Sequence, residues 1–149
     1  MKKYIIAIAG STSRTTLCAE TLKSDSRFEI SWILTPRPKP VGRKKTVSPN
    51  PLDIFAKENK IPVIYVETKI DELEQNQILA SSTNVKTNVA NTQETTPNIP
   101  QPDFLLVVDF GYFIPTWLLK LPIIAPLNIH PSELPKWRGS SPGQFSILF

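Results

Sequence analysis

Short apolar runs separated by helix-like stretches constrain the fold of this chain more than any other feature. The first run, Tyr4 to Ala9, is continuously apolar and leads into Gly10-Ser11-Thr12. A strand buried on both faces has this pattern, and such strands are typical of parallel sheets covered by helices. Further runs of this kind are Glu29 to Leu34, Pro62 to Val66, Phe104 to Phe110 and Ala125 to His130. The pattern predicts an α/β domain with a mostly parallel sheet.

The stretches between these runs predict helices and one insertion. Helices are expected at Thr15 to Lys23, Leu52 to Asn59 and, as a short turn, Pro115 to Lys120. From about Glu67 to Pro102 the chain is rich in Thr, Asn, Gln, Ser and Glu, so we predict a flexible insertion there, with a weak helix around Ile70 to Ala80. The whole chain, residues 1–149, has the size of one domain.

The cysteine count and the hydropathy of the chain indicate in which cellular compartment the protein is expected. Cys18 is the only cysteine, which excludes an intrachain disulfide and a cysteine-based metal cluster. The apolar run after Met1-Lys2-Lys3 is too short for a lipoprotein signal, and Arg14 interrupts it before the cysteine. No stretch approaches the roughly 20 apolar residues of a membrane span. We therefore expect a cytoplasmic protein that does not enter a membrane.

A basic stretch follows the second predicted strand. No acidic residue occurs between Ile30 and Leu52, whereas five residues there are positively charged: Arg37, Lys39, Arg43, Lys44 and Lys45. The charge alone fits either an anionic partner or a solvated basic loop.

The end of the last predicted strand carries the candidate chemistry. In Leu127-Asn128-Ile129-His130 alternation places Asn128 and His130 on one face and sends Ile129 into the core. The carboxyl end of a parallel strand is where open α/β sheets bind ligands. An amide and an imidazole there can hold the oxygen of a tetrahedral acyl-transfer intermediate. In the alternative interpretation Asn128 caps the strand and His130 is a polar rim residue.

The stretch LNIHPSELPKWRGSSPGQ resembles the hallmark sequence of folate-dependent formyltransferases, an Asn-x-His strand end followed by Ser-Leu-Leu-Pro and an aromatic-Arg-Gly. LLVVDFGYFIP is similar to the apolar strand and Tyr-Gly turn of that family. TPRPKPVGRKKTVSPNPL is similar to the basic loop of its methionyl-tRNA formyltransferases. The resemblance implies a Rossmann-like domain that is incomplete at its carboxyl end.

The resemblance also implies site residues. Asn128 and His130 match two of the three polar residues that the family uses for formyl transfer. Glu133 stands where the family has leucine, and Asp109 stands where a small residue is usual. The residues implied to contact folate are Phe110, Gly111, Ser132, Glu133, Leu134 and Pro135.

The implied substrates are 10-formyltetrahydrofolate, consumed as one-carbon donor, and initiator methionyl-tRNA, without a metal. Arg43, Lys44 and Lys45 match the loop that enters the acceptor end of the tRNA, where they would neutralise phosphates. The turn Gly10-Ser11-Thr12-Ser13 lacks both G-x-G-x-x-G and a G-K-[ST] ending, which argues against a dinucleotide site.

The family's third polar residue is an aspartate well downstream of the Asn-x-His pair, and this chain ends at Phe149 before reaching it. We therefore expect a fragment that lacks the family's carboxyl-terminal tRNA-binding domain and is inactive and poorly stable alone. Two alternatives stay open: a formyltransferase for another amine, such as a nucleotide sugar or glycinamide ribonucleotide, and a non-catalytic remnant.

Overall fold

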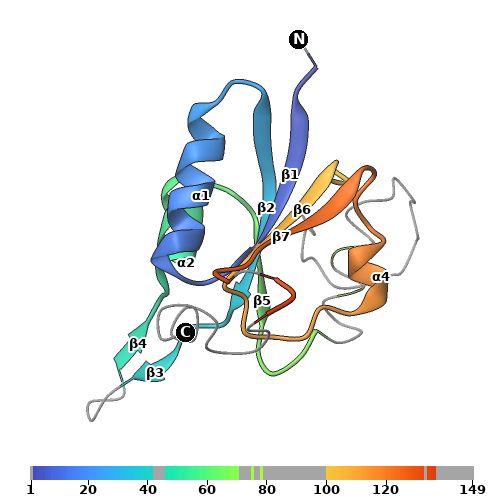
Figure 1. The fold of residues 1–149 in the computed structure, drawn as a ribbon. Coiled ribbons are helices and arrows are strands. Elements are labelled where there is room, and N and C mark those ends of the chain that lie inside the picture. The colour runs from blue at the N-terminus through green and yellow to red at the C-terminus, as the bar shows by residue number, and fades with distance from the viewer. Residues whose placement is uncertain are drawn as a thin grey trace, which may run out of the picture.

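The structure is a computed structural model that describes residues 2–41, 46–70, 75, 78, 100–132 and 134–136. Its centre is a parallel sheet with the strand order β5-β2-β1-β6-β7 (Figure 1). The strands are β1 (Tyr4–Gly10), β2 (Phe28–Pro36), β5 (Val63–Val66), β6 (Phe104–Val108) and β7 (Ala125–Ile129). The predicted α/β class with a mostly parallel sheet is confirmed.

Helices cover both faces of the sheet. The helices α1 (Ser13–Ser24) and α2 (Pro51–Glu58) lie on one face, and the short helix α4 (Thr116–Leu119) lies on the other (Figure 1). The buried side chains form two hydrophobic core clusters, one on each face of the sheet. Ala19 of α1 and Phe55 of α2 belong to one cluster, and Leu118 of α4 belongs to the other. The sheet is therefore the middle layer of three.

β1 runs through the centre of the sheet, with β2 and β6 as neighbours. Its residues from Ile6 to Ala9 are buried, alternately in the two core clusters, which explains why this strand is apolar at every position. The strand ends at Gly10, where a Cβ would overlap with Thr15 and with the carbonyl oxygen of Val108. Glycine lets the first turn of α1 pack directly against the end of β6.

Side chains fix the starts of both long helices. Thr12 caps α1 in a reciprocal capping box with Thr15. Asn50 caps α2 by accepting a hydrogen bond from the backbone N–H of Asp53, and Pro51 occupies the first helical position. The predicted helices at Thr15 to Lys23 and Leu52 to Asn59 are confirmed, with shifted ends.

The proline-rich stretch contains regular structure that the sequence did not predict. β2 extends to Pro36, and β3 (Lys39–Val41) then pairs antiparallel with β4 (Thr46–Ser48). Pro40 is tolerated because this two-stranded hairpin is separate from the main sheet, so its missing N–H disrupts no central strand. The sequence pattern assigns no strand to this stretch, so the hairpin corrects that interpretation.

Most of the segment 67–102 lies outside the described residues, so its interpretation as an insertion stays a prediction. Residues 75 and 78 are helical, as the weak helix prediction requires. Ile78 is buried in the core cluster on the α4 face, and Ile70 packs against that cluster. The segment therefore contributes to the core, although its composition suggested that it would not.

The structure corrects two predictions about the last two strands, the end of β6 and the burial of a residue in β7. β6 ends at Val108 rather than Phe110, because Asp109 adopts a left-handed backbone conformation with φ of 49°. Ile129 is 48% exposed, so the expectation that it enters the core was wrong. In the part of the chain that the structure describes, β7 is an edge strand with a neighbour only on its β6 side, and its residues from Pro126 to Ile129 are exposed.

None of the described helices is long and apolar enough to cross a membrane.

Candidate active site at the carboxyl edge of the sheet

The loops that follow β1, β6 and β7 meet at one edge of the sheet. Val107 pairs with Asn128, and Val108 pairs with Ile129, so Asp109 and His130 leave neighbouring strands at the same level. The chain after β1 enters α1 on one face, whereas the chain after β6 leads to α4 on the other face (Figure 1). Open α/β sheets bind ligands at such a switch in direction. The carboxyl edge at β1, β6 and β7 is therefore the candidate site.

His130 is held by the turn that follows it. Its Nδ1 lies 2.8 Å from Ser132 Oγ, and Ser132 Oγ donates to the carbonyl oxygen of Lys136 at 3.2 Å. When the hydroxyl proton points to Lys136, the Ser132 oxygen is left to accept a hydrogen bond from Nδ1. This arrangement places the proton on Nδ1 and leaves Nε2 for a ligand.

Asn128 lies in β7 two residues before His130, on an exposed position of the strand. Among the described residues, none forms a side-chain hydrogen bond with its amide. An exposed amide beside an imidazole can donate to an oxygen of a bound molecule. The structure thus brings Asn128 and His130 to one strand end, while their catalytic role stays a prediction.

Phe110 and Gly111 lie next to this strand end, directly after Asp109. Phe110 is half-buried and packs against the core, with its ring centroid 5.5 Å from that of Tyr112. Gly111 is exposed, and a Cβ placed there would meet no atom within 4 Å. Phe110 packs inward against the core, and the space outside Gly111 is open. This arrangement suits the predicted contact of the segment with the flat ring of folate.

The turn predicted to contact folate is described only in part. Ser132 holds His130, and the backbone N–H of Leu134 donates to the carbonyl oxygen of Ser132 at 3.1 Å. Leu134 is 54% exposed, and the peptide bond between Leu134 and Pro135 is cis. Glu133 lies outside the described residues. Among the described residues of this turn, Ser132 is the one whose side chain is hydrogen-bonded to a predicted catalytic residue.

The sequence interpretation missed a charged cluster at the same edge. The Asp109 carboxylate accepts hydrogen bonds from Thr12 Oγ1 at 2.8 Å and from Arg14 Nε and Nη2 at 2.8 and 3.0 Å. Thr15 Oγ1 donates to the carbonyl oxygen of Val108 at 2.8 Å. The signal in the sequence was an aspartate directly after the apolar run FLLVV, a position at the ligand-binding end of a strand.

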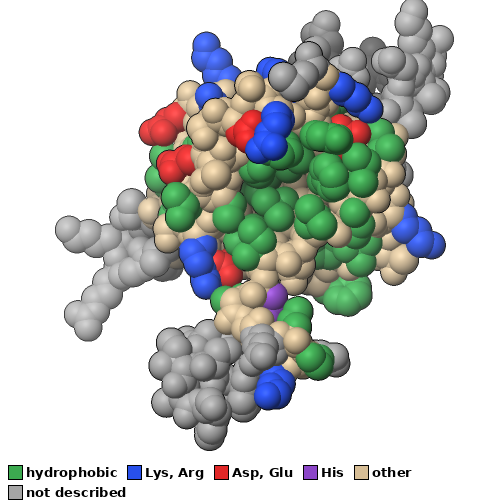
Figure 2. Space-filling model, turned by 45° about the horizontal axis from the view of Figure 1, so that its top comes forward, with side chains coloured by type: hydrophobic (Ala, Val, Ile, Leu, Met, Phe, Trp, Pro, Cys, Tyr) green, Lys and Arg blue, Asp and Glu red, His purple; other side chains and the backbone are tan. Residues whose placement is uncertain are grey.

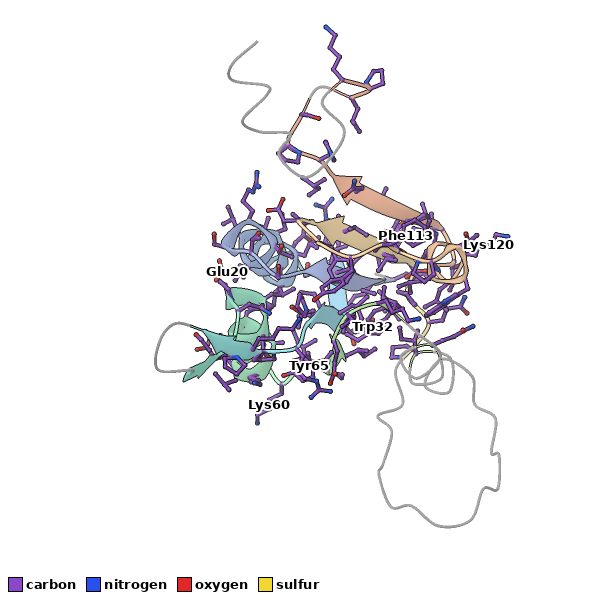
Figure 3. All side chains as sticks on the ribbon, turned by 90° about the horizontal axis from the view of Figure 1, so that it is seen from below. Glu20, Trp32, Lys60, Tyr65, Phe113 and Lys120 are labelled. Carbon is purple, nitrogen blue, oxygen red and sulfur yellow. The ribbon has the colours of Figure 1, made fainter. Side chains whose placement is uncertain are left out.

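A second polar cluster supports the base of the β3–β4 hairpin. The buried carboxylate of Asp53 accepts hydrogen bonds from Tyr65 Oη at 2.6 Å and from Lys57 Nζ at 3.0 Å. The hydrogen bond to Asp53 raises the pKa of Lys57, and burial raises the pKa of Tyr65. Tyr65 lies on the α2 side of the sheet, far from Phe113 (Figure 3).

The basic hairpin is anchored to this cluster through Arg37. The Arg37 guanidinium lies 5.2 Å from the Tyr65 ring centroid, and its Nε pairs with Glu67 at 2.8 Å. Lys39 begins β3 opposite Ser48. The predicted RNA-binding residues Arg43, Lys44 and Lys45 lie outside the described residues, in the connection between β3 and β4.

Within the described residues, no group of three or more His, Cys, Asp or Glu side chains is arranged to hold a metal ion.

Solved structures with the same fold include phosphoribosylglycinamide formyltransferases. The one from Brucella melitensis superposes with a TM-score of 0.63 at 17% identity, over 98% of this chain and 66% of its own. The one from Bacillus halodurans superposes with a TM-score of 0.62 at 21% identity, over 97% of this chain and 64% of its own. At such identities the likeness shows the fold alone.

Curated relatives are more similar in sequence. The methionyl-tRNA formyltransferase of Ehrlichia chaffeensis is 33% identical over 133 residues, which are 89% of this chain and 37% of the relative. That of Sulfurovum sp. is 33% identical over 147 residues, which are 98% of this chain and 41% of the relative. The chain thus spans about two fifths of the length of these relatives.

A family profile covers nearly the whole chain. The profile described as formyl transferase matches residues 2–148. It includes the β1–α1 turn, the segment after β6 and the Asn-x-His end of β7. By this match, the chain belongs to the formyl transferase family.

Proposed function

We propose that the chain takes part in transferring the formyl group of 10-formyltetrahydrofolate to the amine of methionyl initiator tRNA. The observation that carries this proposal is the juxtaposition of two strand ends at the carboxyl edge: Asn128 and the Ser132-held His130 stand at the end of β7, and the paired strand β6 leads into the open segment at Gly111. The proposed reaction belongs to translation initiation, which would place the protein in the cytoplasm.

The proposed reaction requires hydrogen-bond donors at the formyl oxygen. When an amine attacks the formyl carbon, that oxygen gains negative charge, and preorganised donors stabilise it. Asn128 would donate through its amide. His130 would donate through Nε2 when protonated, because Nδ1 faces Ser132. After the folate nitrogen accepts a proton and leaves, the formyl group stays on the amine.

The folate would lie along the segment after β6. Phe110 gives this segment a packed base, and the space outside Gly111 lets a ring approach the backbone closely. Ser132, Glu133, Leu134 and Pro135 follow His130 and would contact the rest of the folate. No Cβ blocks the approach at position 111.

The acceptor is proposed from the relatives and from charge. The curated relatives are named methionyl-tRNA formyltransferases. Arg43, Lys44 and Lys45 fall in the sequence between β3 and β4, and three adjacent positive charges there would suit contact with phosphates of an acceptor stem. A small amine acceptor would not need such a hairpin.

Two titrations test this proposal. We expect 10-formyltetrahydrofolate to bind the chain saturably in isothermal titration calorimetry, and initiator tRNA to bind it in a salt-dependent manner. Glycinamide ribonucleotide is the competing acceptor. Tighter binding of that nucleotide than of tRNA, with folate binding intact, would reassign the acceptor. Absence of folate binding would refute the proposed function.

A further inference from the structure

Asp109 is the residue at which β6 ends and the segment proposed to bind folate begins. Its φ of 49° lies in the left-handed region, which is unfavourable for residues that carry a Cβ. This conformation turns the chain out of the sheet and sets the direction in which Phe110 and Gly111 follow. Asp tolerates this region better than most residues that carry a Cβ, and contacts of its side chain can stabilise the turn further.

The Asp109 carboxylate is held at several points. It accepts from Thr12 Oγ1 at 2.8 Å and from two nitrogens of Arg14 at 2.8 and 3.0 Å. The Asp109 side chain is 13% exposed, whereas that of Arg14 is 63% exposed. A two-nitrogen arginine pair fixes the orientation of a carboxylate as well as its position. The pair of Arg14 with Asp109 thus restrains the turn more than a single hydrogen bond between the two side chains would.

The partners of Asp109 belong to a rigid element. Thr12 caps α1, and Arg14 lies in its first turn. That turn is also joined to β6 by the buried hydrogen bond from Thr15 Oγ1 to the carbonyl oxygen of Val108. Since α1 packs on the sheet, the carboxylate ties the turn after β6 to the core and not to a loop.

We propose that Asp109 is a positioning residue for the folate, which it does not itself contact. By holding the left-handed turn against Thr12 and Arg14, it presents Phe110 and Gly111 in a binding-ready arrangement. This inference rests on the proposed function, because it takes the segment at Gly111 as a folate-binding surface. A segment ordered before binding loses less conformational entropy when the ligand arrives.

The test separates backbone strain from side-chain restraint. Asp109→Gly removes the carboxylate and its three hydrogen bonds but suits the left-handed conformation, so the two effects oppose each other and the thermal midpoint should change little. The same variant should weaken 10-formyltetrahydrofolate binding by about tenfold, because the segment must then be ordered on binding. Arg14→Ala should also weaken 10-formyltetrahydrofolate binding. Asp109→Asn tolerates this conformation and keeps a hydrogen-bond acceptor, so it should recover part of the affinity.

The chain offers a matched control for each change. Lys60 also has a left-handed backbone, with φ of 55°, and lies near α2 on the side away from Phe113 (Figure 3). Lys60→Gly should relieve the same kind of backbone strain as Asp109→Gly does without changing folate affinity. Arg27 forms a comparable exposed pair with Asp25, between α1 and β2 at the opposite end of the strands. Arg27→Ala should leave folate affinity unchanged.

The outcomes distinguish this inference from the proposed function. Folate affinity that falls in Asp109→Gly at a thermal midpoint that changes little supports positioning. Unchanged affinity in Asp109→Gly would overturn it, and so would a parallel fall of affinity and midpoint, which marks a merely structural role. If the unaltered chain bound no 10-formyltetrahydrofolate, the proposed function would fail and this inference with it.

Discussion

His130 Nδ1 and Ser132 Oγ lie 2.8 Å apart, so the side chain two residues downstream orients the only histidine of the chain. Ser132→Ala should release the imidazole and mix its two neutral tautomers. Nitrogen-15 shifts of the His130 ring measure this directly, with Ser24→Ala as control because Ser24 bonds only within the last turns of α1. Identical ring shifts in Ser132→Ala and the unaltered chain would show that this hydrogen bond does not set the tautomer.

Asn128→Ala should lower formyl transfer by on the order of a hundredfold, as expected when an oxyanion donor is lost. Because residues 1–149 span about two fifths of the length of the relatives, the assay compares the variant and the unaltered sequence, each in a chimera with the remainder of a related methionyl-tRNA formyltransferase. Because Asn128 is exposed on β7, thermal stability should not change. Equal turnover in the two chimeras would remove Asn128 from the reaction. Glu29→Ala, at an exposed position of β2, is the control.

Replacing Arg43, Lys44 and Lys45 together by alanine should weaken initiator tRNA binding. The slope of log affinity against log salt should shrink by about 2, if each side chain neutralises one phosphate. The control replaces three exposed lysines at the other end of the molecule, Lys2, Lys3 and Lys23, and so removes the same charge. If both triple variants behave alike, only the net charge matters and the hairpin is no specific RNA contact.

The open side of β7 should promote self-association. Hydrophobic side chains gather over one face of the molecule (Figure 2), and Leu127 and Ile129 are each 48% exposed on a strand with an unpaired edge in the described sheet. Exposed apolar edges pair with other chains, and lysines prevent this. Leu127→Lys with Ile129→Lys should reduce concentration-dependent association in sedimentation velocity experiments. Ile54→Lys, on α2, should not, because Ile54 is exposed away from a sheet edge.

Stability should fall at alkaline pH through the cluster at Asp53. The pKa values of Lys57 and Tyr65 are raised in the folded chain above their ordinary values of 10.5 and 10.0. Their contribution is therefore complete below the unfolded values and is lost as pH rises through the folded ones. Urea unfolding followed from pH 8 to 11 should show this loss, and Tyr65→Phe should reduce it. An equally steep loss in Tyr65→Phe would exclude the tyrosine as a cause.

The sequence predicted the elements whose pattern follows from burial alone. β1 was predictable because both of its faces are covered, which requires an apolar residue at each position from Ile6 to Ala9. The β3–β4 hairpin was not, because Pro40 argues against a strand unless the strand lies outside the main sheet. Ile129 was misplaced because alternation says which residues share a face and not whether that face is covered.

The candidate site was predictable where it depends on one strand end. Asn128 and His130 follow from the Asn-x-His spacing and from the position of β7. The contacts of Asp109 with Thr12 and Arg14 join residues more than ninety positions apart, so no local pattern reveals them. The left-handed backbone of Asp109 has no local signal in the sequence either, because glycine is the residue that usually marks such a conformation.

The central claim is that folate binds beside Asn128 and His130 at the carboxyl edge of the sheet. Since the chain has one histidine, its imidazole resonances in NMR spectra report on this edge without assignment of other residues. Titration with 10-formyltetrahydrofolate should shift these resonances saturably, with the same dissociation constant as calorimetry gives. Binding that leaves the His130 resonances unchanged would place the folate elsewhere and contradict the account.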